Sequence, residues 1–363
     1  MVAALRIALI GAGNMGRQHL HHLQSVPSAR LCALADPDPA AAELAAQWAV
    51  PHFRDHRQLL ESVRPEAVIV ANPNALHVAT ALDCLALGIP LLLEKPVGTT
   101  SEEVAQLLHA QRDQRVPLLV GHHRRHNPLI ARTRELLRQG AIGRLVTVTA
   151  LWQLQKPESY FESAWRREAG AWMLLTNLIH DLDLLRHLCG EVRQVQAFAD
   201  NALRGYANAD SAAISLRFES GALGSLTASD GAVAPWSWEL TSGENPVYPH
   251  QSDQSCYLFA GTEGALSVPQ LRLWRYAEPG AGWHQPLVSE VRRPGHEEAL
   301  WLQLEHFVRV ARGAEAPLVS AEDAARTLAL VAAVERAAAS GTAQRPERVS
   351  GPYSGLVSSL ARS

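Results

Sequence analysis

The sequence has few of the features that mark a secreted, membrane-embedded or nucleic-acid-binding protein. Its 363 residues include four widely spaced cysteines and no C-x-x-C pair, so we expect reduced thiols in a cytoplasmic protein. No run of 18 apolar residues could form a membrane span, and the first apolar run has the length of a strand rather than of a signal peptide. A formal net charge of -3 without a basic block argues against nucleic acid or an anionic membrane as the main partner. A small-molecule substrate is the expected partner.

A glycine-rich loop near the N-terminus is the most informative feature that is present. The apolar run Leu5 to Ile10 leads into Gly11-Ala12-Gly13-Asn14-Met15-Gly16, and Asp36 ends the next apolar run. The glycines allow a tight turn and close backbone approach, and the helix that begins near Asn14 directs free N–H groups at a pyrophosphate. Asp36 would accept hydrogen bonds from the ribose hydroxyls. Because Pro37-Asp38-Pro39 contains no Arg or Lys for a 2′-phosphate, NAD is favoured over NADP.

The pattern of apolar runs changes about a third of the way along the chain. Through residue 121, short apolar strands alternate with helical segments, which predicts a parallel sheet covered on both faces. Beyond it, alternating strands are separated by turns. We therefore predict an α/β protein with a Rossmann dinucleotide-binding domain over residues 1–121. An α+β domain with an open, mostly antiparallel sheet is predicted over residues 122–363, and the open face of this sheet is an expected subunit interface.

Three helices and one long loop are predicted within the second domain. The helices cover Ala171 to Leu188, Glu297 to Arg312 and Ala321 to Ser340. The stretch Ala232 to Ser255 is rich in Pro, Ser, Asn and Gly and contains two tryptophans, so we expect a loop that could line a pocket.

Two charged residues directly follow a buried strand in Glu94-Lys95-Pro96. This is the carboxyl end of the predicted sheet, where open α/β sheets bind ligands. Pro96 restricts Lys95 to extended geometry and could form a cis bond. An ammonium there could stabilise a developing alkoxide beside a nicotinamide. The alternative is a surface ion pair at a strand end.

The predicted helix Ala171 to Leu188 is apolar on nearly every side, so its polar residues need partners. At the α-helical period, Thr176, Asn177, His180 and Asp183 share one face. Since an ordinary histidine has a pKa of about 6.5, His180 could take a proton from a substrate hydroxyl while Asp183 orients the ring. The alternative is a structural core histidine bonded to Asp183.

Several other histidines and arginines are candidates with weaker signals. His122 and His126 lie four residues apart, but the segment Gly121 to Pro128 has no carboxylate and we predict no metal site there. Arg124 and Arg125 are expected to bond to backbone or to a ligand at the domain junction. Arg166 could reach a polar substrate, although a surface position fits equally well. The histidines at positions 19, 21 and 22 are expected on a solvated helix face.

Taken together, these motifs resemble the glucose-fructose oxidoreductase, inositol dehydrogenase and MocA family over nearly the whole chain. The matching elements are the glycine loop, Ala71-Asn72-Pro73-Asn74-Ala75-Leu76-His77, Glu94-Lys95-Pro96, Gly121 to Pro128, Trp165-Arg166, His180-Asp181-Leu182-Asp183 and Gly261-Thr262-Glu263-Gly264. The resemblance implies an NAD(P)-dependent oxidoreductase that acts on a sugar, polyol or cyclitol. It also implies a homodimer or homotetramer built through the open sheet.

The resemblance also implies roles for individual residues. Lys95 and His180 would flank the reacting hydroxyl as the catalytic pair. Cofactor contacts would come from Gly11, Gly13, Asn14, Met15, Gly16, Asp36, Asn72, Asn74, His77, Glu94 and Lys95. Substrate contacts would come from His123, Arg124, Arg166, Thr176 and Asn177.

One departure from the family pattern affects the expected chemistry. Many members have an aspartate four residues before the histidine, whereas this chain has Thr176 followed by Asn177. These side chains can bind a substrate but cannot act as a carboxylate base. Two alternatives therefore remain open: an NAD-binding sensor without catalysis, and an enzyme that cleaves glycosidic bonds by transient oxidation with bound NAD.

Overall fold

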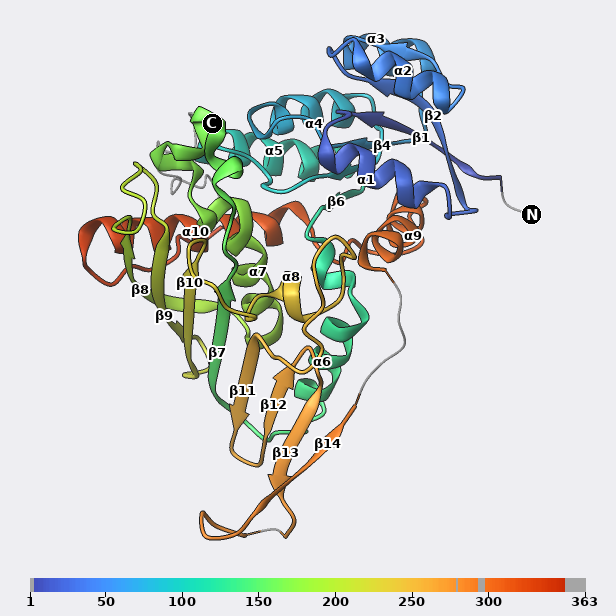
Figure 1. Cartoon of the computed structure of the whole chain (residues 1–363). Helices are drawn as coiled ribbons and strands as arrows, with labels where there is room; N and C mark the ends of the chain where they lie inside the picture. Colours follow the sequence, from blue (N-terminus) through green and yellow to red (C-terminus); the bar gives the residue numbers. More distant parts are fainter. Residues whose placement is uncertain (1–2, 279, 293–297, 350–363) are drawn as a thin grey trace.

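A computed structural model of the chain describes residues 3–278, 280–292 and 298–349 (Figure 1). Its N-terminal part is a six-stranded sheet in the order β3-β2-β1-β4-β5-β6, and every pairing in it is parallel. The strands are β1 (Leu5–Ile10), β2 (Ala29–Ala35), β3 (His52–Phe53), β4 (Ala67–Val70), β5 (Leu91–Leu93) and β6 (Leu118–Val120). This topology confirms the predicted Rossmann fold.

The helices of this part cover a sheet whose central strands are buried on both faces. Every residue of β4, β5 and β6 is buried, which is why these strands are continuous apolar runs. The helices are α1 (Asn14–Leu23), α2 (Ala40–Gln47), α3 (His56–Val63), α4 (His77–Ala86) and α5 (Ser101–Gln114), with a short 3-10 turn, η1 (Asn74–Leu76). A capping box between Thr100 and Glu103 fixes the start of α5.

The C-terminal part is built on an eight-stranded sheet in the order β14-β13-β12-β11-β7-β10-β9-β8. Among the described pairings, β7 with β10 is parallel and the others are antiparallel, so the prediction of a mostly antiparallel sheet is confirmed. The strands are β7 (Leu145–Gln153), β8 (Val192–Asp200), β9 (Ser211–Phe218), β10 (Leu223–Ser229), β11 (Tyr257–Gly261), β12 (Ala265–Val268), β13 (Arg272–Tyr276) and β14 (Leu287–Val291).

Helices lie along one face of this sheet, where Figure 1 shows α7 and α10 behind the strands. Burial alternates strictly along β9, so its two faces differ in exposure. The helices of this part are α6 (Pro128–Arg138), α7 (Ile179–Cys189), α8 (Trp238–Thr241), α9 (Ala299–Ala311) and α10 (Ala321–Ser340). The predicted start of the ninth helix, Glu297, lies outside the described residues. Within the described part, no helix is long and apolar enough to cross a membrane.

The helix predicted over Ala171 to Leu188 is not one continuous α-helix. A 3-10 turn, η5 (Ala169–Ala171), is followed by a π-helical turn, η6 (Leu174–Leu178), and only then by α7. A π turn has more residues per turn than an α-helix, so the face relations expected from an α-helical period do not extend back to Thr176. Single π turns often occur at functional sites.

The last helices connect the two hydrophobic cores. Residues of α9 such as Phe307, and the first half of α10 up to Ala329, pack with the core of the Rossmann sheet. From Leu330 onwards, α10 packs with the core of the C-terminal sheet. The core of the first unit therefore includes a segment far beyond residue 121, and the two units are held together by one continuous helix.

Candidate active site

The glycine loop has the shape that a dinucleotide needs. Gly11 has a φ of +96°, and a Cβ there would lie 2.5 Å from the backbone of Ala71. A Cβ at Gly16 would lie 2.0 Å from the Gly11 carbonyl oxygen, whereas no described heavy atom lies within 4 Å of one at Gly13. The helix α1 begins at Asn14 without a side-chain cap, so its first N–H groups are available to an anion. These residues fit a pyrophosphate.

Asp36 stands at the carboxyl end of β2, beside this loop. One carboxylate oxygen accepts a hydrogen bond from the Ala12 N–H at 2.7 Å, and the other accepts from the Asp38 N–H at 2.8 Å. A carboxylate has further lone pairs, so it can still accept from ribose hydroxyls. The side chains of Asp36 and Asp38 both place negative charge where a 2′-phosphate would bind. The arrangement fits NAD better than NADP.

The loop after β4 is fixed by a buried histidine. The ring of His77 is buried, with Nδ1 2.7 Å from the Pro96 carbonyl oxygen and Nε2 3.0 Å from the Asn72 carbonyl oxygen. His77 therefore joins two loops at the edge of the sheet and positions them, rather than presenting a free nitrogen to a cofactor. Asn72 donates to the Thr80 hydroxyl, and its buried Oδ1 has no partner among the described residues. Asn74 is exposed in η1.

Glu94 has a buried partner that the sequence pattern did not indicate. Its Oε1 lies 2.8 Å from His19 Nε2, and both side chains are buried. The expectation of a solvated face is therefore wrong for His19, because the first turns of α1 pack over the carboxyl ends of the strands. A Cβ at Gly121 would lie within 2.9 Å of the Glu94 carboxylate, so a larger residue there would have to displace that carboxylate. Glu94 supports the loop that carries Lys95.

Lys95 connects the Rossmann sheet to the segment that carries His180. The Lys95–Pro96 peptide is cis, as the sequence suggested. The Lys95 ammonium donates to the Thr176 carbonyl oxygen at 3.2 Å, in the π-helical turn η6. Burial lowers the pKa of Lys95, while the neighbouring Glu94 carboxylate raises it. Two segments about 80 residues apart in sequence thus meet at one site.

His180 lies in a cluster of histidine rings at the start of α7. Its ring makes edge-to-face contacts with His123, at 5.1 Å between centroids, and with His122, at 6.0 Å. Its Nδ1 is buried without a hydrogen-bond partner in the described part of the chain. Burial, the Lys95 ammonium and the Arg124 guanidinium hold the pKa of His180 well below its ordinary value. The imidazole is therefore neutral at pH 7 and able to accept a proton.

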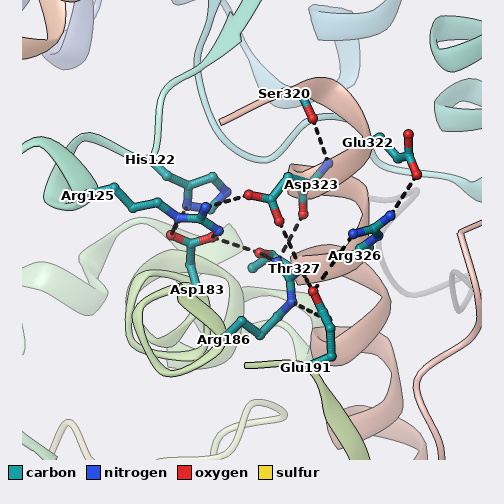
Figure 2. A network of polar contacts seen from close by, with 10 residues as sticks. All are labelled: His122, Arg125, Asp183, Arg186, Glu191, Ser320, Glu322, Asp323, Arg326 and Thr327. Carbon is teal, nitrogen blue, oxygen red and sulfur yellow. Dashed lines mark hydrogen bonds and ion pairs between the residues drawn. The ribbon is translucent and has the colours of Figure 1, made fainter. Parts of the chain in front are cut away.

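Asp183 does not orient His180, and both sequence interpretations of this pair are wrong. Arg125 donates two hydrogen bonds of 2.7 and 2.6 Å to the Asp183 carboxylate, and the Thr327 hydroxyl donates to it at 2.8 Å (Figure 2). Burial alone would raise the pKa of Asp183, but His122 and Arg125 outweigh it and hold the pKa well below its usual range. Asp183 belongs to an ion-pair network between α7 and α10.

Arg124 and Arg125 find carboxylate partners rather than backbone. Arg124 is buried and pairs with Glu239 at 2.7 Å and with Asp181 at 3.5 Å. Glu239 also accepts from the Trp152 indole at 3.1 Å. These contacts hold α8, which lies within the predicted loop Ala232 to Ser255, against the segment Gly121 to Pro128. A substrate contact by Arg124 stays a prediction.

The same loop supplies a second acid that sequence reasoning did not select. Glu244 Oε1 lies 3.7 Å from His123 Nε2, and the other oxygen of Glu244 accepts from the Trp238 indole. The only sequence signal was the pair of tryptophans in a polar stretch. Nothing in its spacing relates Glu244 to a histidine 121 residues earlier.

The remaining predicted substrate contacts lie on the segments before α7. Arg166 donates to the Tyr160 carbonyl oxygen at 2.8 Å, and its guanidinium lies over the Tyr160 ring at 4.1 Å. The Thr176 hydroxyl donates to Asn177 Oδ1 at 2.9 Å. Thr176 and Asn177 are both partly exposed. Their contact with a substrate stays a prediction.

The histidine pair with metal-like spacing is separated in the structure. His122 contacts His180 and Asp183, whereas His126 Nε2 lies 2.9 Å from His306 Nδ1. Over residues 3–278, 280–292 and 298–349, no group of three or more His, Cys, Asp or Glu side chains is arranged to hold a metal ion.

Two family models match the chain. Residues 5–122 match a model described as an oxidoreductase family with an NAD-binding Rossmann fold, GFO/IDH/MocA. Residues 130–267 match the GFO/IDH/MocA C-terminal domain. The two matches together cover most of the chain, including the whole Rossmann sheet and the C-terminal sheet as far as β12.

Relatives in sequence and structure agree with these matches. An inositol 2-dehydrogenase from Rhizobium meliloti is 27% identical over 92% of this chain and 97% of its own length. The rhizopine catabolism protein MocA from the same species is 29% identical, over 51% of this chain and 57% of that protein. An oxidoreductase from Agrobacterium radiobacter, crystallised with NAD+, L-tartaric acid and magnesium, is 20% identical with a TM-score of 0.79 over 94% of this chain and 98% of its own. At that identity, the last match shows the fold alone.

Proposed function

This chain belongs to the GFO/IDH/MocA oxidoreductase family, and on that premise we propose that it is an NAD-dependent dehydrogenase or reductase of a sugar, polyol or cyclitol. The observation that carries the proposal is the meeting of Lys95 with the segment of His180 at the carboxyl edge of the Rossmann sheet. Ligands of open α/β sheets bind at that edge. The substrate class is supported by the relatives named inositol dehydrogenases.

Each member of the pair has a distinct role in this proposal. When bound, the nicotinamide of NAD supplies the acceptor for a hydride from the substrate carbon. His180 accepts the hydroxyl proton in the oxidation direction, since burial and nearby cations keep its imidazole neutral. The Lys95 ammonium stabilises the negative charge that develops on the same oxygen. Remaining hydroxyls of the substrate would contact His123, Arg166, Thr176 and Asn177.

The open face of the C-terminal sheet supports a homo-oligomer. Large apolar side chains are exposed along these strands, which is unusual for a monomer surface. They include Val146, Phe198, Leu223, Leu258 and Trp274. A second copy of the chain that packs its own sheet on this face would bury them. Light scattering should then give a mass of two or four chains, and a monomer at micromolar concentration would contradict this assembly.

The test of the proposed function is a panel of cyclitols, polyols and sugars assayed with NAD and with NADP. We expect reduction of NAD with at least one compound, and weaker use of NADP because of Asp36 and Asp38. Lys95→Ala should lower kcat by about 100-fold or more, because it removes the charge that stabilises the alkoxide. Equal turnover by the wild type and Lys95→Ala would contradict the site. Tight NAD binding without any turnover would favour a sensor, and glycoside cleavage without net reduction of NAD would favour the glycosidase alternative.

A further inference from the structure

Among the buried polar atoms at the site that lack hydrogen-bond partners in the described chain, three lie on side chains that are neighbours in space. They are His180 Nδ1, His123 Nδ1 and Glu244 Oε1. Buried polar atoms in native proteins are usually paired, and exceptions call for an explanation in terms of function, strain or an unseen water. These three atoms belong to side chains that follow one another in space: His180 contacts His123, and His123 faces Glu244.

The other buried acids near His180 are already engaged. Asp183 is held by Arg125 and Thr327, and Asp181 accepts from Tyr257 and pairs with Arg124. Glu94 is bonded to His19. The neighbouring groups that most affect the pKa of His180 are Lys95, Arg124, His123 and His122. None of them is an acid. Glu244 is thus the carboxylate through which a proton from this cluster can leave.

We propose that His123 and Glu244 form a proton relay that serves His180. The inference rests on the proposed function, because it needs an alcohol proton to carry. It assigns His123 and Glu244 as positioning residues that act through His180, and it explains why the sequence can lack a carboxylate at Thr176 or Asn177, in the turn next to Lys95.

The relay has a balanced sequence in the oxidation direction. The substrate O–H bond breaks and its proton goes to His180 Nε2. Bound NAD would supply the acceptor for the hydrogen on the hydroxyl-bearing carbon, which leaves with its electron pair. Neither link is a direct hydrogen bond, so each transfer would run through a bridging water: the proton on His180 Nδ1 passes to His123 Nδ1, and the proton on His123 Nε2 passes to Glu244 across 3.7 Å. Glu244 Oε1 is buried but the side chain as a whole is 12% exposed, which places the end of the relay next to solvent. Reduction runs through the same steps in reverse.

The first test replaces the carboxylate with an amide of the same shape. Glu244→Gln can still accept from the Trp238 indole, so the loop should keep its position. Without the negative charge, His123 becomes a weaker base and its pKa falls. We expect kcat to fall about tenfold with little change in KM, and the acid limb of the kcat/KM profile to move to lower pH. Unchanged kcat and an unchanged pH profile would overturn the relay.

A double-mutant cycle distinguishes a relay from two independent effects. If Glu244 acts through His123, then Glu244→Gln should have no further effect on kcat in a His123→Gln background. Fold losses that multiply in the double variant would contradict the relay, because they would mean that each side chain acts on the substrate separately.

A second His–Glu pair in the chain provides a matched control. His306 Nε2 lies 3.7 Å from Glu315 Oε2, the same separation as between His123 and Glu244, but the His306 ring packs against His126 rather than against His180. Glu315→Gln should leave kcat and the pH profile unchanged. A loss of activity equal to that of Glu244→Gln would show that the effect comes from any lost carboxylate, and would overturn the assignment.

Histidine NMR of the protein without substrate gives a readout that does not depend on turnover. Glu244→Gln should lower the pKa of His123, and Glu315→Gln should lower that of His306 and leave His123 unchanged. A His123 pKa that does not respond to Glu244→Gln would overturn the relay. If the wild type turns over no alcohol while this coupling is present, the proposed function fails. If the wild type turns over and Glu244→Gln matches it, only the relay fails.

Discussion

Two polar clusters lie one helical turn apart on α7, and they differ in how fully their groups are paired. At Asp183, both carboxylate oxygens accept hydrogen bonds, from Arg125 and Thr327 (Figure 2). At His180, the buried Nδ1 has no hydrogen-bond partner within the described chain, and neither has His123 Nδ1 or Glu244 Oε1. The paired cluster connects α7 to α10. The unpaired cluster faces Lys95.

The difference separates a structural role for Asp183 from the proposed catalytic role of His180 on the same helix. A buried carboxylate that accepts hydrogen bonds on both oxygens cannot take part in proton transfer without weakening those contacts. An unpaired imidazole costs stability but is ready to bind or exchange a proton. We therefore expect substitutions at Asp183 to lower stability and substitutions at His180 to lower activity.

The largest expected effect is on stability at the paired cluster. Asp183→Ala leaves the Arg125 guanidinium buried with only Asp323 to balance it. We expect the free energy of unfolding to fall by about 3–5 kcal/mol, as when one partner of a buried ion pair is removed. Urea denaturation measures this change. Arg326→Gln is the matched control, because its pairs with Glu322 and Glu191 are exposed and their loss should cost less than about 1 kcal/mol. Equal losses of unfolding free energy in Asp183→Ala and Arg326→Gln would contradict a special structural role for the buried cluster.

A smaller expected effect is a different pH dependence of the free energy of unfolding for the two clusters. The folded pKa of His180 lies below the unfolded value of about 6.5, so the unfolded chain binds a proton that the folded chain does not once the pH falls below that value. Stability should decline below about pH 6.5, by up to about 1.4 kcal/mol per pH unit for this histidine. For Asp183, with its depressed pKa, the loss begins only near the unfolded carboxyl value of about 3.9.

Urea denaturation at pH 7, 6 and 5 measures this slope. His180→Gln should make the slope shallower by the share of this one histidine, because His122, His126 and His187 also have lowered pKa values and keep contributing. Asp183→Asn should shift the whole curve downward without changing the slope in this range. A slope that is the same in the wild type and in His180→Gln would mean that the buried ring is not held neutral.

Much of the fold follows from local patterns in the sequence. The glycine loop, the apolar runs of β4 and β5, and Asp36 at the end of β2 predict a Rossmann unit, because each is a local consequence of strand period and turn geometry. The alternating strands of the second sheet follow for the same reason. Lys95 and His180 are also predicted from local context, as polar residues next to buried apolar runs, and their catalytic roles stay a proposal.

The partners of these residues could not be predicted, because they come from distant segments. Local spacing predicts that Asp183 bonds to His180, one turn away. Instead, Arg125 and Thr327, which lie 58 and 144 residues from it in sequence, donate hydrogen bonds to its carboxylate. His19 meets Glu94 for a similar reason. The π-helical turn before α7 and the contact of Glu244 with His123 depend on how α8 packs on the histidine segment. Hydrophobic periodicity contains no information on such contacts.

The most direct test of the account is His180→Gln, with kcat/KM and the free energy of unfolding measured on the same preparation at pH 7. We predict that kcat/KM falls by at least about 100-fold, since general base catalysis is lost. The free energy of unfolding should stay within about 1 kcal/mol of the wild type. A variant that keeps its kcat/KM would contradict the central claim that the unpaired imidazole beside Lys95 is the catalytic base.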